Sequence, residues 1–217
     1  MLNLHGYSKM FTQKLAYQPN NQHYFQHLAH LPQAVWLDSC HDLQPRGQYD
    51  IISAMPADLL SVQNGSTYIN NKPSALTVFD AINKQLEPLK IHHDPNLNLP
   101  FTLGAIGYLG YDTAWQLEKL PAYSNHDVTL PEAQVGIYHW SIVTDHHSKT
   151  TLLIAIDKQT AEQVTELLQN PPQKNTKLAL ESSFQSNMSF SKYRQSFNRL
   201  KQHIIDGDCY QANLWFC

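Results

Sequence analysis

Short hydrophobic segments bounded by turn residues fill the first three quarters of the chain. Their length and their β-branched or aromatic content are typical of strands. Predicted strands lie at residues 34–37, 49–54, 59–63, 67–70, 103–111, 135–143 and 151–156. Asn64-Gly65 predicts a tight hairpin between two of them, and the turn at 145–149 predicts a second. Apolar residues at helical spacing predict helices over residues 23–31, 73–86 and 160–168.

The clearest helical pattern lies near the end of the chain. Its apolar residues fall on a single face and are Phe190, Tyr193, Phe197, Leu200 and Ile204. Ser189 or Ser191 can cap the start of this helix, and Gly207 suits its end. Residues 209–216 then alternate between two kinds of side chain, which predicts a strand.

The order of these elements predicts the fold class. Strands dominate and helices are interspersed among them, which indicates an α+β protein. With 217 residues, of which 42% are hydrophobic, the chain can form one large domain or two modest ones. Asn170-Pro171-Pro172 begins the best linker candidate.

Charge and cysteine content exclude several classes of function. The formal net charge of -3 and the scattered basic residues give no surface for nucleic acid. The apolar runs are too short to cross a membrane, and the polar N-terminus does not resemble a signal peptide. Three cysteines without CxxC spacing predict neither a zinc site nor a disulfide framework. We therefore expect a cytoplasmic protein.

Two patterns invite a cofactor interpretation that we consider weak. His23 and His27 have the i, i+4 spacing of a metal-ligand pair, but the glutamate of an HExxH motif is absent. Surface or capping histidines are the simpler interpretation, also for His146 and His147 in a polar loop. The three glycines between residues 104 and 110 do not form a phosphate-binding motif, and they favour close packing of a strand.

Three polar residues are better candidates for a binding site. Ser39 directly follows a buried strand and either binds the polar end of a ligand or serves as a turn residue. Gln211 and Asn213 fall on the same face of the predicted last strand. They either offer donors and acceptors to a polar ligand or form an exposed strand face.

Several segments, in their order and spacing, carry a family resemblance. Residues 206–214 read Asp-Gly-Asp-Cys-Tyr-Gln-Ala-Asn-Leu, and residues 104–112 read Gly-Ala-Ile-Gly-Tyr-Leu-Gly-Tyr-Asp. Residues 36–39 read Trp-Leu-Asp-Ser, and residues 136–140 read Gly-Ile-Tyr-His-Trp. Over residues 22–214 the chain resembles the aminodeoxychorismate synthase component I family of chorismate-using enzymes. Anthranilate synthase component I is the nearest related family, and Tyr210 and Asn213 favour the para-aminobenzoate branch.

The resemblance implies an architecture. Such proteins have two facing, mostly antiparallel β-sheets wrapped by helices. On this basis residues 1–170 are an anthranilate synthase component I-like N-terminal domain and residues 171–188 are a linker. Residues 189–217 are then the incomplete start of a chorismate-binding domain, and the fold is truncated.

The resemblance also implies an activity. The family converts chorismate, with ammonia from a glutamine amidotransferase subunit, to 4-amino-4-deoxychorismate for para-aminobenzoate and folate synthesis. It uses a magnesium ion held by glutamates and a nucleophilic lysine. These residues match positions beyond Leu214, so we expect no catalytic residue and no metal ligand in these 217 residues. We expect the chain alone to be inactive.

A second ligand follows from the resemblance. Some members bind tryptophan beside the element that matches residues 36–39. The expected tryptophan-binding residues are Ser39, Arg46, Gly47, Gln48 and Tyr49. Tyr210, Gln211 and Asn213 are expected near the chorismate site. The alternatives are an anthranilate synthase component I of tryptophan biosynthesis and a non-catalytic fragment that binds tryptophan or a partner.

Overall fold

The computed structural model of the chain describes residues 10–40, 47–92, 97–118, 130–170, 182–183 and 185–214. Contacts divide the chain into two compact units, Met1–Gln173 and Lys174–Cys217. Arg46 and most of the predicted linker lie outside the described residues. We therefore describe each unit separately.

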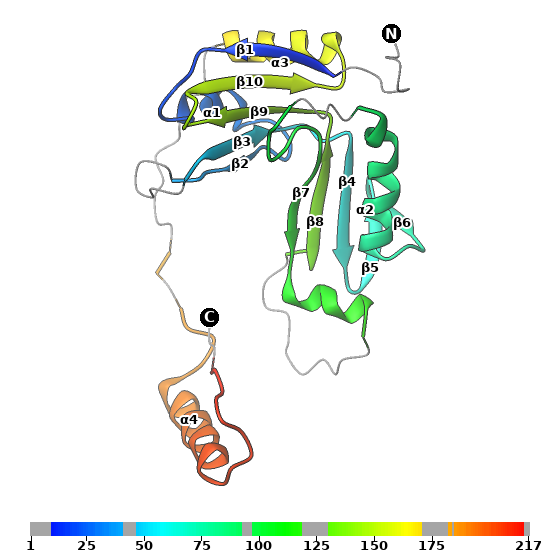
Figure 1. The fold of residues 1–217 in the computed structure, drawn as a ribbon. Helices are drawn as coiled ribbons and strands as arrows, with labels where there is room; N and C mark the ends of the chain where they lie inside the picture. The colour runs from blue at the N-terminus through cyan, green and yellow to red at the C-terminus, as the bar shows by residue number, and fades with distance from the viewer. Residues whose placement is uncertain are drawn as a thin grey trace. The chain divides into compact units, whose positions relative to one another are not determined.

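The first unit contains two five-stranded sheets, whose strands run in different directions in Figure 1. The first sheet has the order β1-β10-β9-β3-β2, with β1 (Phe11–Leu15), β10 (Thr150–Ala155), β9 (Trp140–Asp145), β3 (Tyr49–Ser53) and β2 (Val35–Leu37). The second has the order β6-β5-β4-β8-β7, with β6 (Lys72–Ser74), β5 (Ser66–Ile69), β4 (Asp58–Gln63), β8 (Ala133–Tyr138) and β7 (Gly104–Leu109). The strands pair in antiparallel fashion. The predicted α+β class with two antiparallel sheets wrapped by helices is confirmed.

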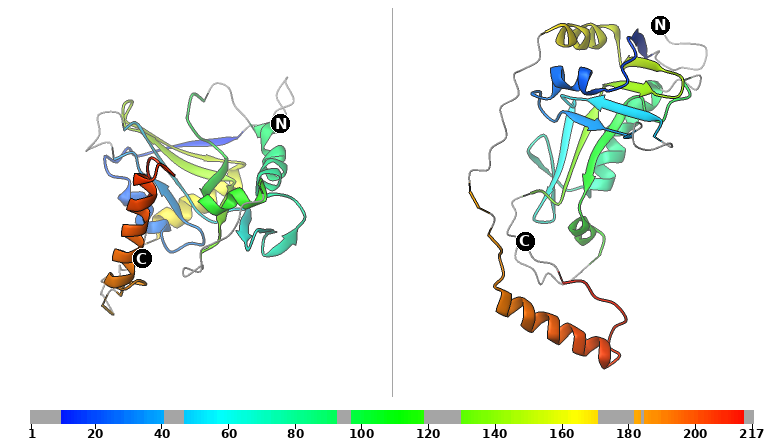
Figure 2. Two further views of the ribbon diagram at one scale, coloured as in Figure 1. Left: turned by 90° about the horizontal axis from the view of Figure 1, so that it is seen from below. Right: turned by 90° about the vertical axis from the view of Figure 1, so that its left-hand side faces the viewer.

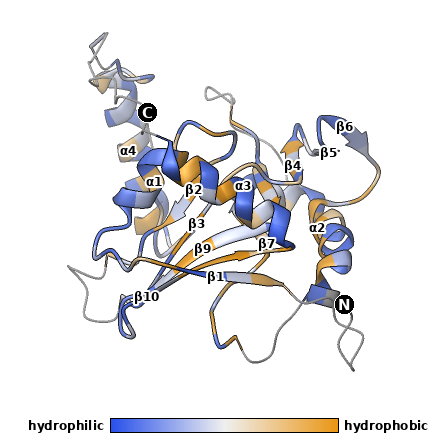
Figure 3. Ribbon diagram, turned by 90° about the horizontal axis from the view of Figure 1, so that it is seen from above, coloured by the Kyte–Doolittle hydropathy of each residue, from blue (hydrophilic) through white to orange (hydrophobic). Residues whose placement is uncertain are grey.

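Helices cover a face of each sheet. α1 (Gln22–Leu28) and α3 (Lys158–Gln169) pack on the first sheet, around a core that includes Leu28, Ile52 and Leu153. α2 (Val78–Leu86) packs on the second sheet, and η1 (Glu87–His92) continues it. A further short helix, η2 (Tyr111–Gln116), follows β7. Figure 2 shows the helices and sheets of this unit from two further sides. The helices carry hydrophobic and hydrophilic residues side by side, which is typical of helices with one buried face (Figure 3).

The apolar run at 135–143 is two strands, so the prediction of one strand is wrong. It divides at His139, and β8 belongs to the second sheet whereas β9 belongs to the first. The ring of Tyr138 fills the space beside Gly136, where an added Cβ would lie 2.6 Å from it. Its hydroxyl donates a hydrogen bond to the Gln33 carbonyl at 2.8 Å, and burial raises the pKa of Tyr138 to about 12. Continuous burial removes the alternation that would have revealed the break.

Other boundaries also differ from the prediction. The helix predicted over 73–86 begins at Val78, because Pro73 lies in the edge strand β6, where its missing N–H is tolerated. The strand β1 was not predicted, since its middle residues are polar. The Asn64-Gly65 hairpin is confirmed, with φ angles of 51° and 72°. The hairpin that joins β9 and β10 is also confirmed.

The second unit contains one long helix, α4 (Phe190–Ile205). Its predicted cap is confirmed, because the Ser189 hydroxyl accepts a hydrogen bond from the Lys192 N–H at 3.3 Å. The helix ends before Gly207, which has a φ of 81°. The strand predicted at 209–216 is wrong over its described part, residues 209–214, which form no strand. A strand needs a hydrogen-bonded neighbour, and the described residues supply none there.

In the part of the chain that the structure describes, we find no helix that is both long and apolar enough to cross a membrane.

Candidate ligand-binding site beside Ser39

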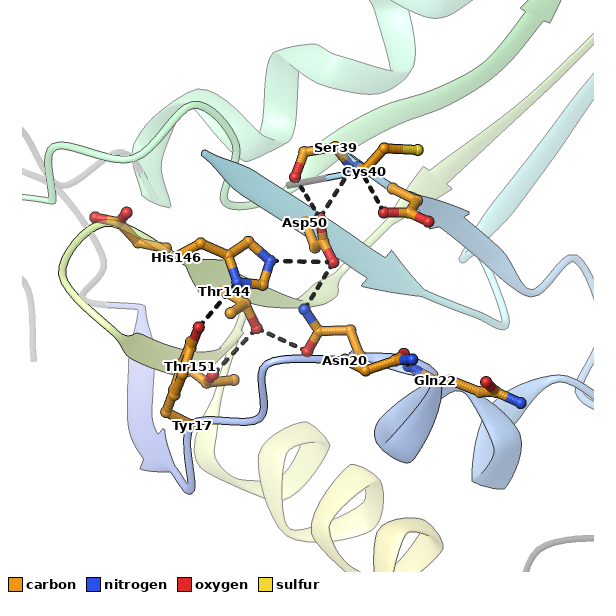
Figure 4. A network of polar contacts seen from close by, with 12 residues as sticks. Tyr17, Asn20, Gln22, Ser39, Cys40, Asp50, Thr144, His146 and Thr151 are labelled. Carbon is orange, nitrogen blue, oxygen red and sulfur yellow. Dashed lines mark hydrogen bonds and ion pairs between the residues drawn. The ribbon is translucent and has the colours of Figure 1, made fainter. Parts of the chain in front are cut away.

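A buried carboxylate in β3, that of Asp50, lies at the centre of a polar network (Figure 4). Ser39 donates two hydrogen bonds to its Oδ1, from the backbone N–H at 2.9 Å and from the hydroxyl at 2.8 Å. Asn21 donates from Nδ2 to Oδ2 at 2.8 Å. Nε2 of His146 makes a longer polar contact with the same oxygen, at 3.3 Å. Oδ1 of Asp50 therefore has two hydrogen-bond donors, and Oδ2 has one donor and the longer contact with the imidazole.

The register of the first sheet explains why these side chains meet. Asp50 lies opposite Thr144 on β9, and Thr144 lies opposite Thr151 on β10. Directly paired residues of an antiparallel sheet point to the same face. The Thr144 hydroxyl donates to Oδ1 of Asn21 at 2.9 Å and lies 3.0 Å from the Thr151 hydroxyl. The network thus links three strands to the segment that precedes α1.

A second branch of the network runs through His146. Its side chain is 1% exposed, and its Nδ1 lies 3.2 Å from the Tyr17 hydroxyl. Because the carboxylate of Asp50 only accepts, the imidazole is assigned a proton on Nε2, and Nδ1 then accepts from the Tyr17 hydroxyl. The interpretation of His146 as a surface or capping histidine is therefore wrong. Its place in the turn after β9 is as predicted, and its backbone N–H donates to the Gln48 carbonyl, next to the start of β3.

The network keeps Asp50 ionised. Burial by itself raises the pKa of the Asp50 carboxyl, but the hydrogen bonds from Asn21, Ser39 and His146 outweigh burial and hold that pKa below its ordinary value. The order of the three functional groups excludes a serine protease-like triad. In such a triad the histidine lies between serine and aspartate, whereas here the aspartate lies between serine and histidine. The arrangement orients Ser39 and does not activate it as a nucleophile.

The residues predicted around Ser39 have different surroundings. Gln48 donates from Nε2 to Oδ1 of Asp145 at 3.3 Å, and its carbonyl accepts from the His146 N–H at 2.8 Å. Tyr49 packs near Val143, on the face of β3 opposite to Asp50. Gly47 directly precedes Gln48 and is half-buried. Ser39 is the predicted site residue that belongs to the Asp50 network.

The three residues predicted near the chorismate site lie in the second unit. Tyr210, Gln211 and Asn213 are exposed and follow α4 in irregular structure. The prediction that Gln211 and Asn213 share a strand face is wrong, since no strand forms over described residues 209–214.

The weaker candidates have structural explanations. A Cβ at Gly107 would lie 2.1 Å from the Gln134 carbonyl oxygen, so this glycine permits the close approach of β7 and β8. Nδ1 of His27 lies 2.6 Å from the Asn170 carbonyl. Among the described residues, no three His, Cys, Asp or Glu side chains gather as metal ligands would. The described residues therefore do not fit the magnesium ion that the resemblance implies.

Sequence reasoning missed Asp50, Asn21 and His146 as parts of the site. The pattern predicts a strand at Asp50 but does not predict which groups compensate its charge. The available signal was a carboxylate between Tyr49 and Ile51, inside a segment that is otherwise apolar. A buried carboxylate needs donors, and their identity depends on strand pairing that the sequence does not display.

A solved structure shares this fold. The crystal structure of anthranilate synthase component I from Streptococcus pneumoniae TIGR4 superposes with a TM-score of 0.61 at 22% sequence identity. The match covers 75% of this chain and 39% of that chain. The first unit and its two sheets thus have the fold of an anthranilate synthase component I.

Sequence comparison shows the family. Residues 32–216 match the chorismate binding enzyme model, so the chain belongs to the chorismate binding enzyme family. Aminodeoxychorismate synthase component 1 of Salmonella typhimurium is 32% identical over 197 residues, which are 89% of this chain and 43% of that protein. Its Escherichia coli counterpart is 33% identical over 196 residues, 88% of this chain and 43% of that protein. Anthranilate synthase component 1 of Lactococcus lactis is 33% identical over 135 residues, 56% of this chain. The chain spans less than half the length of these relatives.

Proposed function

We propose that this chain is the N-terminal portion of an aminodeoxychorismate synthase component I. The enzyme converts chorismate and glutamine-derived ammonia to 4-amino-4-deoxychorismate for para-aminobenzoate and folate synthesis. The observation that carries the proposal is coverage. The Salmonella typhimurium and Escherichia coli relatives named aminodeoxychorismate synthase component 1 match 89% and 88% of the chain at 32% and 33% identity. Anthranilate synthase relatives match less of it: the Lactococcus lactis protein covers 56% at 33% identity, and the Arabidopsis thaliana protein covers 77% at 28% identity.

The partners and location follow from the same proposal. The name component 1 of these relatives implies a second component, which we take to be a glutamine amidotransferase subunit in the cytoplasm. Chorismate is the substrate and magnesium the cofactor. The resemblance places the lysine, the glutamates and the metal ligands beyond the position of Leu214. In our proposal these 217 residues by themselves therefore perform no chemistry.

The contribution of the first unit is a regulatory amino-acid site. We assign tryptophan to the surroundings of Ser39, with Arg46, Gly47, Gln48 and Tyr49 from the following segment. The position of Ser39 supports this assignment. Ser39 is half-buried, and its backbone N–H and its hydroxyl both donate hydrogen bonds to the carboxylate of Asp50. Such a position suits a residue that contacts a ligand from a fixed direction.

Complementation with two separate polypeptides tests the proposed reaction. The host cells lack component I and require para-aminobenzoate. They express this chain together with a second polypeptide, the portion of the Escherichia coli relative that follows its matched segment. We expect growth without para-aminobenzoate only when both polypeptides are present. The matched control replaces this chain with the corresponding N-terminal portion of the Escherichia coli protein. Growth with that control but not with this chain would count against the proposal.

The same experiment separates the anthranilate synthase alternative. There the second polypeptide is the corresponding portion of the Lactococcus lactis protein, in cells that require tryptophan. We expect no growth from this pairing. Growth here, together with none in the para-aminobenzoate assay, would assign the chain to the anthranilate branch. Growth from this chain alone in either strain would contradict the proposal that its 217 residues are inactive.

A further inference from the structure

A cavity lies where the cores of the two sheets in the first unit adjoin. One apolar wall comes from Leu86 of α2 and Leu89 of η1, which pack on the core of the second sheet. The other comes from Met10 and Leu103, which pack on the core of the first sheet. The cavity volume is about 420 Å³. Small-molecule sites have volumes of about 300–1,000 Å³, so the cavity is large enough for a small ligand.

The walls of this cavity are held in place without a ligand. Met10 is 4% exposed and directly precedes β1. Leu103 follows Thr102, whose carbonyl accepts a hydrogen bond from the Ser141 hydroxyl of β9 at 2.6 Å. It precedes Gly104, where the pairing of β7 with β8 begins. A preformed cavity costs a ligand little ordering of the protein when it binds.

Three polar side chains also line the cavity, those of Lys90, His92 and Thr102. Nδ1 of His92 is buried and has no hydrogen-bond partner among the described residues. A buried polar atom without a partner is unfavourable, because it has lost its hydrogen bonds to water. A ligand that supplies a partner for Nδ1 therefore gains more than it would from an exposed imidazole.

The charge at the cavity determines the kind of polar group that it accepts. Lys90 is exposed and its ammonium group pairs with the Glu87 carboxylate. An ammonium group has three donors, so two remain for a further acceptor. Among the described residues that line the cavity, none is acidic. An anionic group is therefore favoured at the polar end, and a cationic group is disfavoured.

We propose that this cavity binds a small apolar monocarboxylate. Its apolar body lies against the leucine and methionine side chains, and its carboxylate accepts from Nδ1 of His92 and from the Lys90 ammonium group. The site is separate from the one assigned to tryptophan. Ser39 follows β2, whereas the cavity lies beside the start of β1, and these two strands are opposite edges of the first sheet. The inference does not depend on the proposed reaction.

Calorimetry with two matched compounds tests the ligand class on the purified chain. Benzoate is the probe, and benzamide has the same ring and nearly the same size without the charge. We expect benzoate to bind at millimolar concentration or below. Benzamide should bind about fivefold more weakly or worse, because it lacks the attraction to the ammonium group and the charged hydrogen bond.

Methionine methyl signals test the place of binding without any change to the cavity. The chain has four methionines, and their methyl groups can be labelled with ¹³C for magnetic resonance. Benzoate should shift the methyl signal of Met10, which lines the cavity, with the affinity that calorimetry gives. Met55 lies between β3 and β4, away from the described lining residues, and is the internal control whose signal should not move. Met10→Leu assigns the signal.

Four variants test the residues. His92→Phe keeps a ring but removes Nδ1, and should weaken benzoate about tenfold, whereas His92→Asn should restore part of the affinity because its amide replaces that nitrogen. Lys90→Gln should weaken benzoate about twofold to fivefold, the usual worth of an exposed ion pair. Lys84→Gln, which changes an exposed lysine of α2 outside the described lining, is its matched control and should have no effect. Leu103→Trp should fill the cavity and abolish binding of both compounds.

The outcomes separate the parts of the proposal. If the folded chain does not bind benzoate at millimolar concentration, or binds it without a shift of the Met10 signal, the site is wrong. Equal affinities for benzoate and benzamide would overturn the assignment of the carboxylate. Circular dichroism establishes that each variant is folded. If His92→Phe or Leu103→Trp unfolds the chain, the Met10 signal and the comparison of the two compounds on the unmodified chain decide.

Discussion

α2 and α4 are both amphipathic helices with a hydroxyl cap, but their apolar faces have different surroundings. The Thr77 hydroxyl accepts from the Asp80 N–H, and the Ser189 hydroxyl accepts from the Lys192 N–H. α2 buries Val78 and Ala81 against the second sheet. α4 has no buried residue in the described part of the chain, and its Phe190 is 78% exposed.

The difference shows what helical spacing specifies. Spacing and caps determine that a helix forms and which face is apolar. They do not determine what covers that face, which depends on other elements. The same holds for polar groups. The charge of Asp50 is compensated because the register of β3, β9 and β10 brings hydrogen-bond donors to it. Residues 209–214 have no neighbouring strand among the described residues, and they form no strand.

The largest expected effect compares one apolar truncation in each unit. Leu60→Ala removes a fully buried side chain of β4 that packs in one cluster with Ala81 of α2. It should lower the free energy of unfolding by about 2–5 kcal/mol. Phe197→Ala removes a larger side chain from α4 that is 47% exposed, and should change it by less than about 0.5 kcal/mol. Urea denaturation followed by circular dichroism measures both. A loss of unfolding free energy from Phe197→Ala as large as that from Leu60→Ala would show that other residues cover the apolar face of α4.

Local patterns predicted much of the fold. The hairpin at Asn64-Gly65 and the cap at Ser189 depend on neighbouring residues only, and both are confirmed. The break at His139 was missed because residues on both sides of it are buried, in two different sheets. Pro73 was placed in a helix because a proline suits a first turn as well as an edge strand.

The site was less accessible to sequence reasoning. Ser39 was found because it follows a buried strand, and the structure places it in a network. Asp50 is the centre of that network, and the groups that contact its carboxylate come from positions 21, 39 and 146, which lie far apart in the sequence. Such separations are set by sheet pairing, which periodicity does not reveal.

The second expected effect is a pH dependence in the stability of the first unit. The folded pKa of Asp50 lies below its ordinary value, so the unfolded chain binds more protons in the acid range. The stabilisation is complete above the unfolded pKa of about 3.9 and is lost as the pH falls through the lower folded pKa. Asp50→Asn should cost about 1–3 kcal/mol at pH 7, because buried donors lose an acceptor, and should flatten the fall in stability below about pH 5.

Denaturation between pH 2.5 and 7 measures this slope. Some slope should remain in Asp50→Asn, because hydrogen bonds from Ser148, Gln48 and His147 also outweigh burial and lower the pKa of Asp145. The pKa of Asp157 is lowered by its hydrogen bonds to Thr160 at the start of α3. Identical slopes in Asp50→Asn and the unmodified chain would contradict the network's role in keeping Asp50 ionised.

The smallest expected effect compares the two caps. Thr77→Ala removes the acceptor for the Asp80 N–H and should lower the free energy of unfolding by about 1 kcal/mol, since α2 is part of the packed unit. Ser189→Ala removes an equivalent acceptor from a helix without a buried residue among those described. It should reduce helical circular dichroism while the cooperative transition of the first unit stays at the same urea concentration. A shift of that transition by Ser189→Ala would mean that α4 folds as part of the first unit, and the contrast between α2 and α4 would then be one of exposure alone.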